Sequence, residues 1–140
     1  MQCQADIQVL AEIKLKEADC LFKNNFFDGA YYLGGYAVEL LLKAMVCRTL
    51  KIDDFFAFNL PTKKELYKPY KVHDYDDLLI LSGLYSEFNA AQSDVTFKEH
   101  WSLIRGWNEG ARYLTGRSSK DVENFLTSIR EIAKWIRKYL

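Results

Sequence analysis

Apolar positions along the chain recur mostly at the three- and four-residue spacing of an α-helix. This pattern predicts a first helix over about 6–24 and a second helix that runs from a capping Asp28 to about residue 50. The second segment is apolar almost all round, which predicts a central position in the fold. Its charged exceptions, Glu39 and Lys43, stand four residues apart in the order that favours an ion pair.

Three further helices are expected in the second half of the chain. A short one is predicted over about 74–84 and a longer one over about 95–114, closed by Gly116 as a C-cap. A last helix, capped by Ser118 or Ser119, then runs to the C-terminus. Its apolar stripe is the cleanest amphipathic pattern in the chain and consists of Val122, Phe125, Leu126, Ile129, Ile132, Ala133, Ile136 and Leu140.

Helix breakers are rare, and both prolines fall in one stretch, residues 51–73. This stretch is long for a connection in a compact domain, which is typical of a lid, a binding loop or a partner surface. It is rich in aromatic residues, namely Phe55, Phe56, Phe58, Tyr67 and Tyr70. The sequence therefore predicts one all-α domain over 1–140, a small antiparallel bundle of four to five helices with a long aromatic loop.

Charge and composition indicate which kinds of partner and which location the sequence favours. Lysine plus arginine equals aspartate plus glutamate, 19 of each, so binding to DNA driven by bulk charge is not expected. Acids and lysines interrupt the N-terminal apolar residues, and no segment approaches 18 uninterrupted apolar residues, which predicts a cytoplasmic protein without a membrane span. The nine phenylalanines, nine tyrosines and three tryptophans exceed what short helices readily cover, and this favours a homodimer.

Candidate chemistry concentrates in the segment expected to form the fourth helix. If that helix is continuous, Arg105, Asn108 and Arg112 share one face at the spacing i, i+3, i+7. Two guanidinium groups and an amide could hold a phosphate or another anion. Alternatively, one of the arginines pairs with Glu39 in an internal salt bridge that fixes the helix register. Both interpretations remain open from the sequence.

No metal site is expected, because the two histidines have no partner at zinc-ligand spacing. His73, directly before the third helix, is interpreted as a helix-entry residue, and His100 as a surface or partly packed side chain. Cys47 is interpreted as a small core residue. The adjacent Gly34 and Gly35 predict the close approach of a neighbouring helix, with a ligand facing the backbone as the alternative.

Several segments together resemble the HEPN domain (higher eukaryotes and prokaryotes nucleotide-binding). They are FFDGAYYLGGYAVELLLKAMV at 26–46, His73-Asp74 ahead of Leu78-Leu79, WNEGARYL at 107–114, and VENFLTSIREIAKWIRKYL at 122–140. The similarity covers nearly the whole chain and is weakest over 51–71. The resemblance implies an antiparallel helical bundle that dimerises, often encoded beside a minimal nucleotidyltransferase in a toxin–antitoxin or nucleotide-modifying pair.

Active members of that family are metal-independent ribonucleases with an Arg-x4–6-His motif, and this sequence departs from it. No histidine follows Arg105 or Arg112 at that spacing, and His100 precedes Arg105. The prediction is therefore a non-catalytic module, without cofactor, that binds a nucleotide, RNA or a partner protein. Its expected binding residues are Arg105, Asn108, Arg112, Glu39 and Lys43. Two alternatives remain: a ribonuclease that uses His100 or His73 across a dimer, and a purely structural interaction protein.

Overall fold

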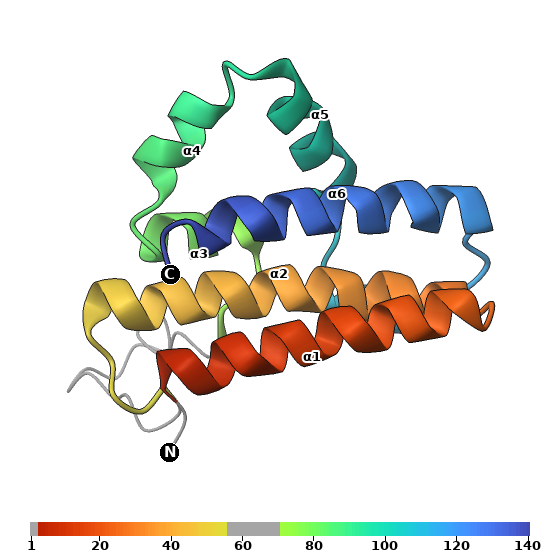
Figure 1. Cartoon of the computed structure of the whole chain (residues 1–140), viewed down its shortest axis with the longest axis horizontal. Coiled ribbons are helices and arrows are strands. Elements are labelled where there is room, and N and C mark those ends of the chain that lie inside the picture. Colours follow the sequence, from red (N-terminus) through yellow and green to blue (C-terminus); the bar gives the residue numbers. More distant parts are fainter. Residues whose placement is uncertain (1–2, 56–70) are drawn as a thin grey trace.

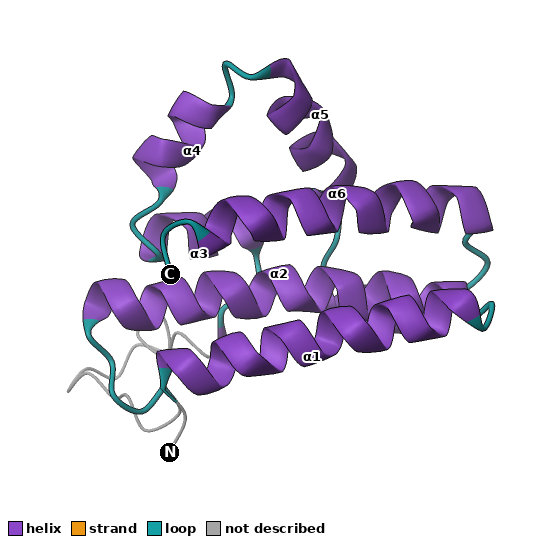
Figure 2. Ribbon diagram, viewed as in Figure 1, coloured by secondary structure: helices purple, strands orange, loops and turns teal. Residues whose placement is uncertain are grey.

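Helices make up all the regular secondary structure in the part of the chain that this computed structural model describes, residues 3–55 and 71–140 (Figure 2). The all-α prediction is confirmed for these residues, although six α-helices replace the expected four to five. The elements are α1 (Gln4–Lys23), α2 (Phe27–Leu50), α3 (Tyr75–Leu81), α4 (Tyr85–Ala91), α5 (Val95–Ile104), the 3-10 helix η3 (Glu109–Tyr113) and α6 (Ser119–Arg137).

The long helices α1, α2 and α6 lie side by side, and α4 and α5 rise as a pair over α6 (Figure 1). α1 runs antiparallel to α2, as its short turn requires. α6 runs in the same direction as α2, so the arrangement is not a simple up-and-down bundle. The connection between α2 and α6 therefore returns along the length of the molecule through α3, α4, α5 and η3.

The predicted central position of α2 is confirmed. Nearly every residue from Gly34 to Cys47 is buried, because α1 packs on one side of α2 and α6 on another. A β-carbon at Gly34 would lie 2.6 Å from a methyl group of Leu126 on α6, which confirms the close approach of a helix. A β-carbon at Gly35 would collide with the indole ring of Trp107, so that ring packs directly on the α2 backbone.

Asp28 does not cap α2, contrary to the sequence prediction. The N-cap lies two residues earlier, at Phe26, which makes no side-chain capping bond. The Asp28 carboxylate instead accepts hydrogen bonds from the backbone N–H groups of Gly116, at 3.0 Å, and Arg117, at 3.1 Å. It thereby anchors the segment that leads into α6.

The segment between α3 and η3 differs most from the prediction. The expected third helix ends at Leu81, ahead of Gly83 with a positive φ of 77°, and α4 follows where no helix was expected. The expected helix over 95–114 is also wrong, since α5 ends at Ile104. Asn108 starts η3 by accepting a hydrogen bond from the N–H of Gly110, and an asparagine between two glycines favours such a break.

The last helix agrees closely with its prediction. Ser118 caps α6, with its hydroxyl accepting the N–H of Asp121 at 3.1 Å, and the predicted stripe is buried apart from the partly buried Leu140. Gly116 has a positive φ of 91° but lies in the link to α6 and does not close a helix.

In the aromatic loop, Phe55 is buried, whereas Phe56, Phe58, Tyr67 and Tyr70 lie outside the described residues. None of the described helices has the length and apolar character needed to cross a bilayer.

Candidate functional site

The predicted arginine face does not form. Because the chain leaves the helix after α5, Arg105 lies at the end of that helix, whereas Arg112 lies on η3. Asn108, between them, uses its side-chain oxygen to start η3. Arg105 is therefore separated from η3, and Arg112 interacts with Tyr32 of α2.

Glu39 and Lys43 form the ion pair that their spacing predicted, with Nζ 2.6 Å from Oε1. Both residues are buried on α2, at 1% and 5% exposure. The proposed salt bridge from Glu39 to Arg105 or Arg112 is wrong. The same carboxylate oxygen instead lies 2.9 Å from Nδ1 of His73, which enters from the segment before α3.

His73 bridges two acidic side chains from different elements. Its Nδ1 faces Glu39 on α2, and its Nε2 lies 3.3 Å from Oε2 of the half-exposed Glu109 on η3. Since carboxylates only accept, both contacts are hydrogen bonds when the two ring nitrogens each carry a proton. Entry into α3 is provided by the neighbouring Asp74, whose carboxylate accepts the N–H groups of Asp76 and Asp77. Sequence reasoning missed this bridge.

Arg112 projects from η3 with its charge uncompensated. Among the described residues, no carboxylate oxygen lies within 4 Å of its guanidinium group. The guanidinium carbon lies 5.0 Å from the centre of the Tyr113 ring, and Tyr113 is 75% exposed. Tyr113, followed by Tyr32 of α2, raises the pKa of Arg112 above its usual value. An arginine beside accessible tyrosines is a typical arrangement for contacts to phosphate and to planar groups.

A row of aromatic rings on α2 connects Arg112 with the His73 bridge. The rings of Tyr32 and Tyr36 stack at a centroid distance of 6.1 Å, and Tyr32 also stacks on Trp107 at 6.0 Å. Tyr36 lies one turn before Glu39; burial, and to a smaller degree the Glu39 charge, raises the pKa of its hydroxyl. We call Tyr32 and Tyr36, together with Arg112 and Tyr113, the tyrosine–arginine face.

His100 and Cys47 have packing roles, as predicted. His100 is partly buried on α5, with its Nδ1 2.9 Å from the hydroxyl of Ser128 on α6. Cys47 is buried in α2, and burial raises the pKa of its thiol to about 11. The described residues contain no cluster of three or more histidine, cysteine or acidic side chains that could hold a metal ion.

No family model matches the chain, and comparisons with curated proteins and with solved structures likewise found no match.

Proposed function

We propose that this chain is a helical module of the HEPN type that binds single-stranded RNA through the tyrosine–arginine face without cleaving it. The observation that carries the proposal is the exposed Arg112, which has no acidic partner among the residues that the structure describes and lies beside exposed Tyr113 and half-buried Tyr32. A guanidinium group can bind two oxygens of one phosphate at once. Neighbouring tyrosines offer flat surfaces on which unpaired bases stack.

The charge balance favours a small site. With a net charge of zero, the chain lacks the excess of basic residues that drives non-specific binding along a nucleic acid. Binding should therefore involve one or two phosphates and should weaken only modestly with added salt. Unpaired bases are needed for stacking, so double-stranded RNA should bind less well.

The binding proposal is tested by fluorescence anisotropy with a labelled short single-stranded RNA. Replacing Arg112 by Ala removes one charge-assisted contact of about 1.5–3 kcal/mol and should weaken binding roughly tenfold to a hundredfold. The melting temperature should stay near that of the unmodified chain, because the Arg112 side chain is exposed.

Arg130→Ala is the matched control. It removes the same charge from α6, where Arg130 pairs with Asp19 of α1, 2.9 Å away. Its affinity for RNA should equal that of the unmodified chain. If Arg112→Ala binds as well as the unmodified chain, or if both variants lose affinity equally, the tyrosine–arginine face is not the RNA site.

A second candidate function, a metal-independent ribonuclease, is favoured by one observation. Glu39 orients the imidazole of His73, an arrangement that can support proton transfer. Against this function, Nε2 of His73 faces the Glu109 carboxylate, which repels a phosphate. Cleavage of the same RNA that is lost in His73→Ala would establish this alternative and overturn the non-catalytic proposal.

The resemblance supports a wider proposal, that the chain is one half of a toxin–antitoxin pair whose other half is a minimal nucleotidyltransferase. A short nucleotidyltransferase reading frame beside this one, with co-purification of the two products, would support the pair. A purely structural interaction protein would show neither RNA binding nor cleavage.

A further inference from the structure

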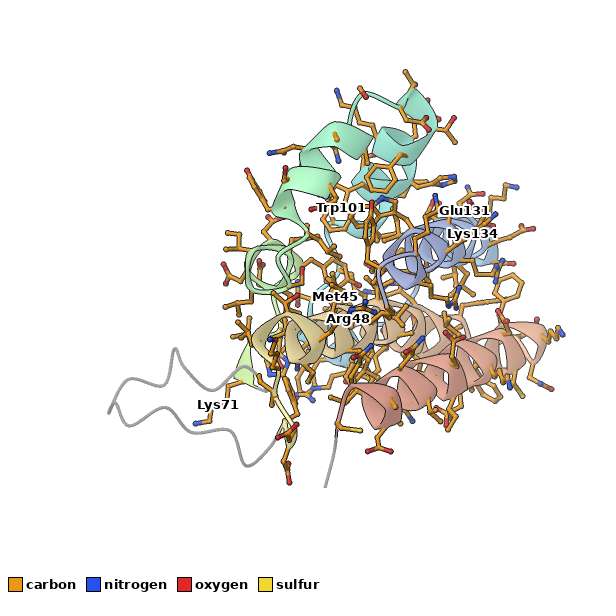
Figure 3. The ribbon with its side chains drawn as sticks, turned by 60° about the vertical axis from the view of Figure 1, so that its left-hand side comes forward. Met45, Arg48, Lys71, Trp101, Glu131 and Lys134 are labelled. Carbon is orange, nitrogen blue, oxygen red and sulfur yellow. The ribbon has the colours of Figure 1, made fainter. Side chains whose placement is uncertain are left out.

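Residues of α3, α4 and α5 line an open surface pocket of about 450 Å³ that is separate from the tyrosine–arginine face. This volume lies within the range typical of small-molecule sites. Tyr85, Phe88 and Trp101 form its aromatic lining, and the last two pack edge to face with ring centres 4.8 Å apart. Trp101, which belongs to α5, is 6% exposed and packs against Phe88 of α4 (Figure 3).

Opposite charges line this pocket without meeting. Arg105, at the end of α5, and Asp76, in the first turn of α3, both line it, and their charged atoms are more than 4 Å apart. No other described side chain forms an ion pair with either residue. A molecule that lies between them and carries both charges would complete two ion pairs.

Gln92 adds an unsatisfied donor to the same pocket. Its amide nitrogen is buried and has no hydrogen-bond partner among the described residues. Leaving a buried donor without an acceptor costs free energy, and such groups in native proteins usually meet a protein atom, a water molecule or a ligand. Gln92 itself lines the pocket, so a rotation of its side chain would bring this donor to an acceptor oxygen placed there.

We propose that this pocket binds a free aromatic α-amino acid. The ligand carboxylate pairs with the guanidinium group of Arg105 and accepts the N–H of Gln92, and the ligand ammonium donates to Asp76. The aromatic side chain packs against the lining formed by Tyr85 and Trp101. Each of the three polar groups and the aromatic lining then has a partner in one small molecule.

The charges of the pocket favour a zwitterion over a nucleotide. Arg105 and Asp76 sum to zero, so a ligand with one charge of each sign is matched at both ends. A phosphate group with up to two negative charges would pair with Arg105 and be repelled by Asp76. A simple aromatic carboxylate would leave Asp76 without a partner.

Isothermal titration calorimetry on the full chain tests this proposal with L-phenylalanine as the probe. N-acetyl-L-phenylalanine lacks the ammonium charge and L-phenylalanine amide lacks the carboxylate, so each should bind at least about tenfold more weakly. Adenosine 5′-monophosphate serves as the nucleotide probe. The proposal is overturned if L-phenylalanine gives no heat, if either derivative binds as well as the amino acid, or if the nucleotide binds more tightly.

Two matched pairs of variants assign the charges. Arg105→Gln and Asp76→Asn should each weaken L-phenylalanine binding at least about tenfold. Lys98→Gln, on the same helix as Arg105, and Asp77→Asn, next to Asp76, remove equal charges outside the pocket and should leave binding unchanged. Equal losses in a variant and its control would overturn the assignment.

Arg112→Ala separates this inference from the proposed RNA site. It should leave L-phenylalanine binding unchanged, because Arg112 does not line the pocket. Loss of amino-acid binding in this variant would overturn the assignment to α3, α4 and α5. Failure of RNA binding alone would leave it standing.

Discussion

Asp28 connects two parts of the chain that are far apart in the sequence. Its carboxylate accepts the backbone N–H groups of Gly116 and Arg117, and the Arg117 guanidinium lies 3.3 Å away. The same guanidinium lies over the ring of Tyr31, 3.9 Å from its centre. The hydrogen bond from the Arg117 backbone, followed by that from Gly116, lowers the pKa of Asp28 below 3.8.

Asp28→Asn should lower the melting temperature at neutral pH, because the amide replaces a charged acceptor. A carboxylate whose pKa is lower in the folded than in the unfolded protein stabilises the fold at any pH above its unfolded pKa, near 3.8 for Asp28. This stabilisation is lost as the pH falls from the unfolded pKa through the folded pKa. The difference in melting temperature between the unmodified chain and the variant should therefore shrink in acid below that pH. Calorimetric melting across the acidic range measures it. A constant difference would contradict this role for Asp28.

Single residues were predictable where their partner lies close in the sequence. The Glu39–Lys43 ion pair was predicted correctly because residues four apart lie next to each other on the surface of a helix. His73 joins Glu39 across 34 positions, and only the completed fold brings them together. The grouping of Arg105, Asn108 and Arg112 failed because it required an unbroken helix through two glycines.

At the scale of elements, long amphipathic or apolar segments were predicted well and short ones were not. α1, α2 and α6 each contain many turns, so the periodicity of their apolar residues outweighs local irregularities. α4 spans only Tyr85–Ala91 and is followed by the polar residues Gln92, Ser93 and Asp94, which also suit a loop. η3 is favoured locally by Asn108 between two glycines, but it also depends on packing of Trp107 against Gly35, which no local pattern reveals.

The buried polar residues of α2 hold the segment before α3 in place. Glu39→Ala removes the carboxylate that contacts both Lys43 and His73, and breaking such a buried pair should cost about 3–5 kcal/mol of unfolding free energy. Urea denaturation measures this loss. Glu109→Ala, which removes the half-exposed second contact of His73, should cost no more than about 1 kcal/mol. Similar costs for both variants would contradict the central role of Glu39.

At the scale of the whole molecule, the homodimer remains a prediction. Exposed apolar side chains occur on α1, near the end of α5 and on η3, and they include Val9, Ile13, Leu103, Tyr113 and Leu114. Pairing of two copies would cover part of this surface. Light scattering at micromolar concentration should give twice the chain mass of 16.4 kDa. A particle of 16.4 kDa would contradict the dimer.

The parallel course of α2 and α6 has a consequence for the order in which the chain folds. α1 and α2 meet across a short turn, so their hairpin forms from contacts close in the sequence. α6 reaches α2 only after the whole connection from 51 to 118 has closed, and closing so long a loop costs entropy before the contacts form. Until then the Gly34 surface of α2 stays open to solvent. We therefore expect α6 to dock onto α2 more slowly than the α1–α2 hairpin forms.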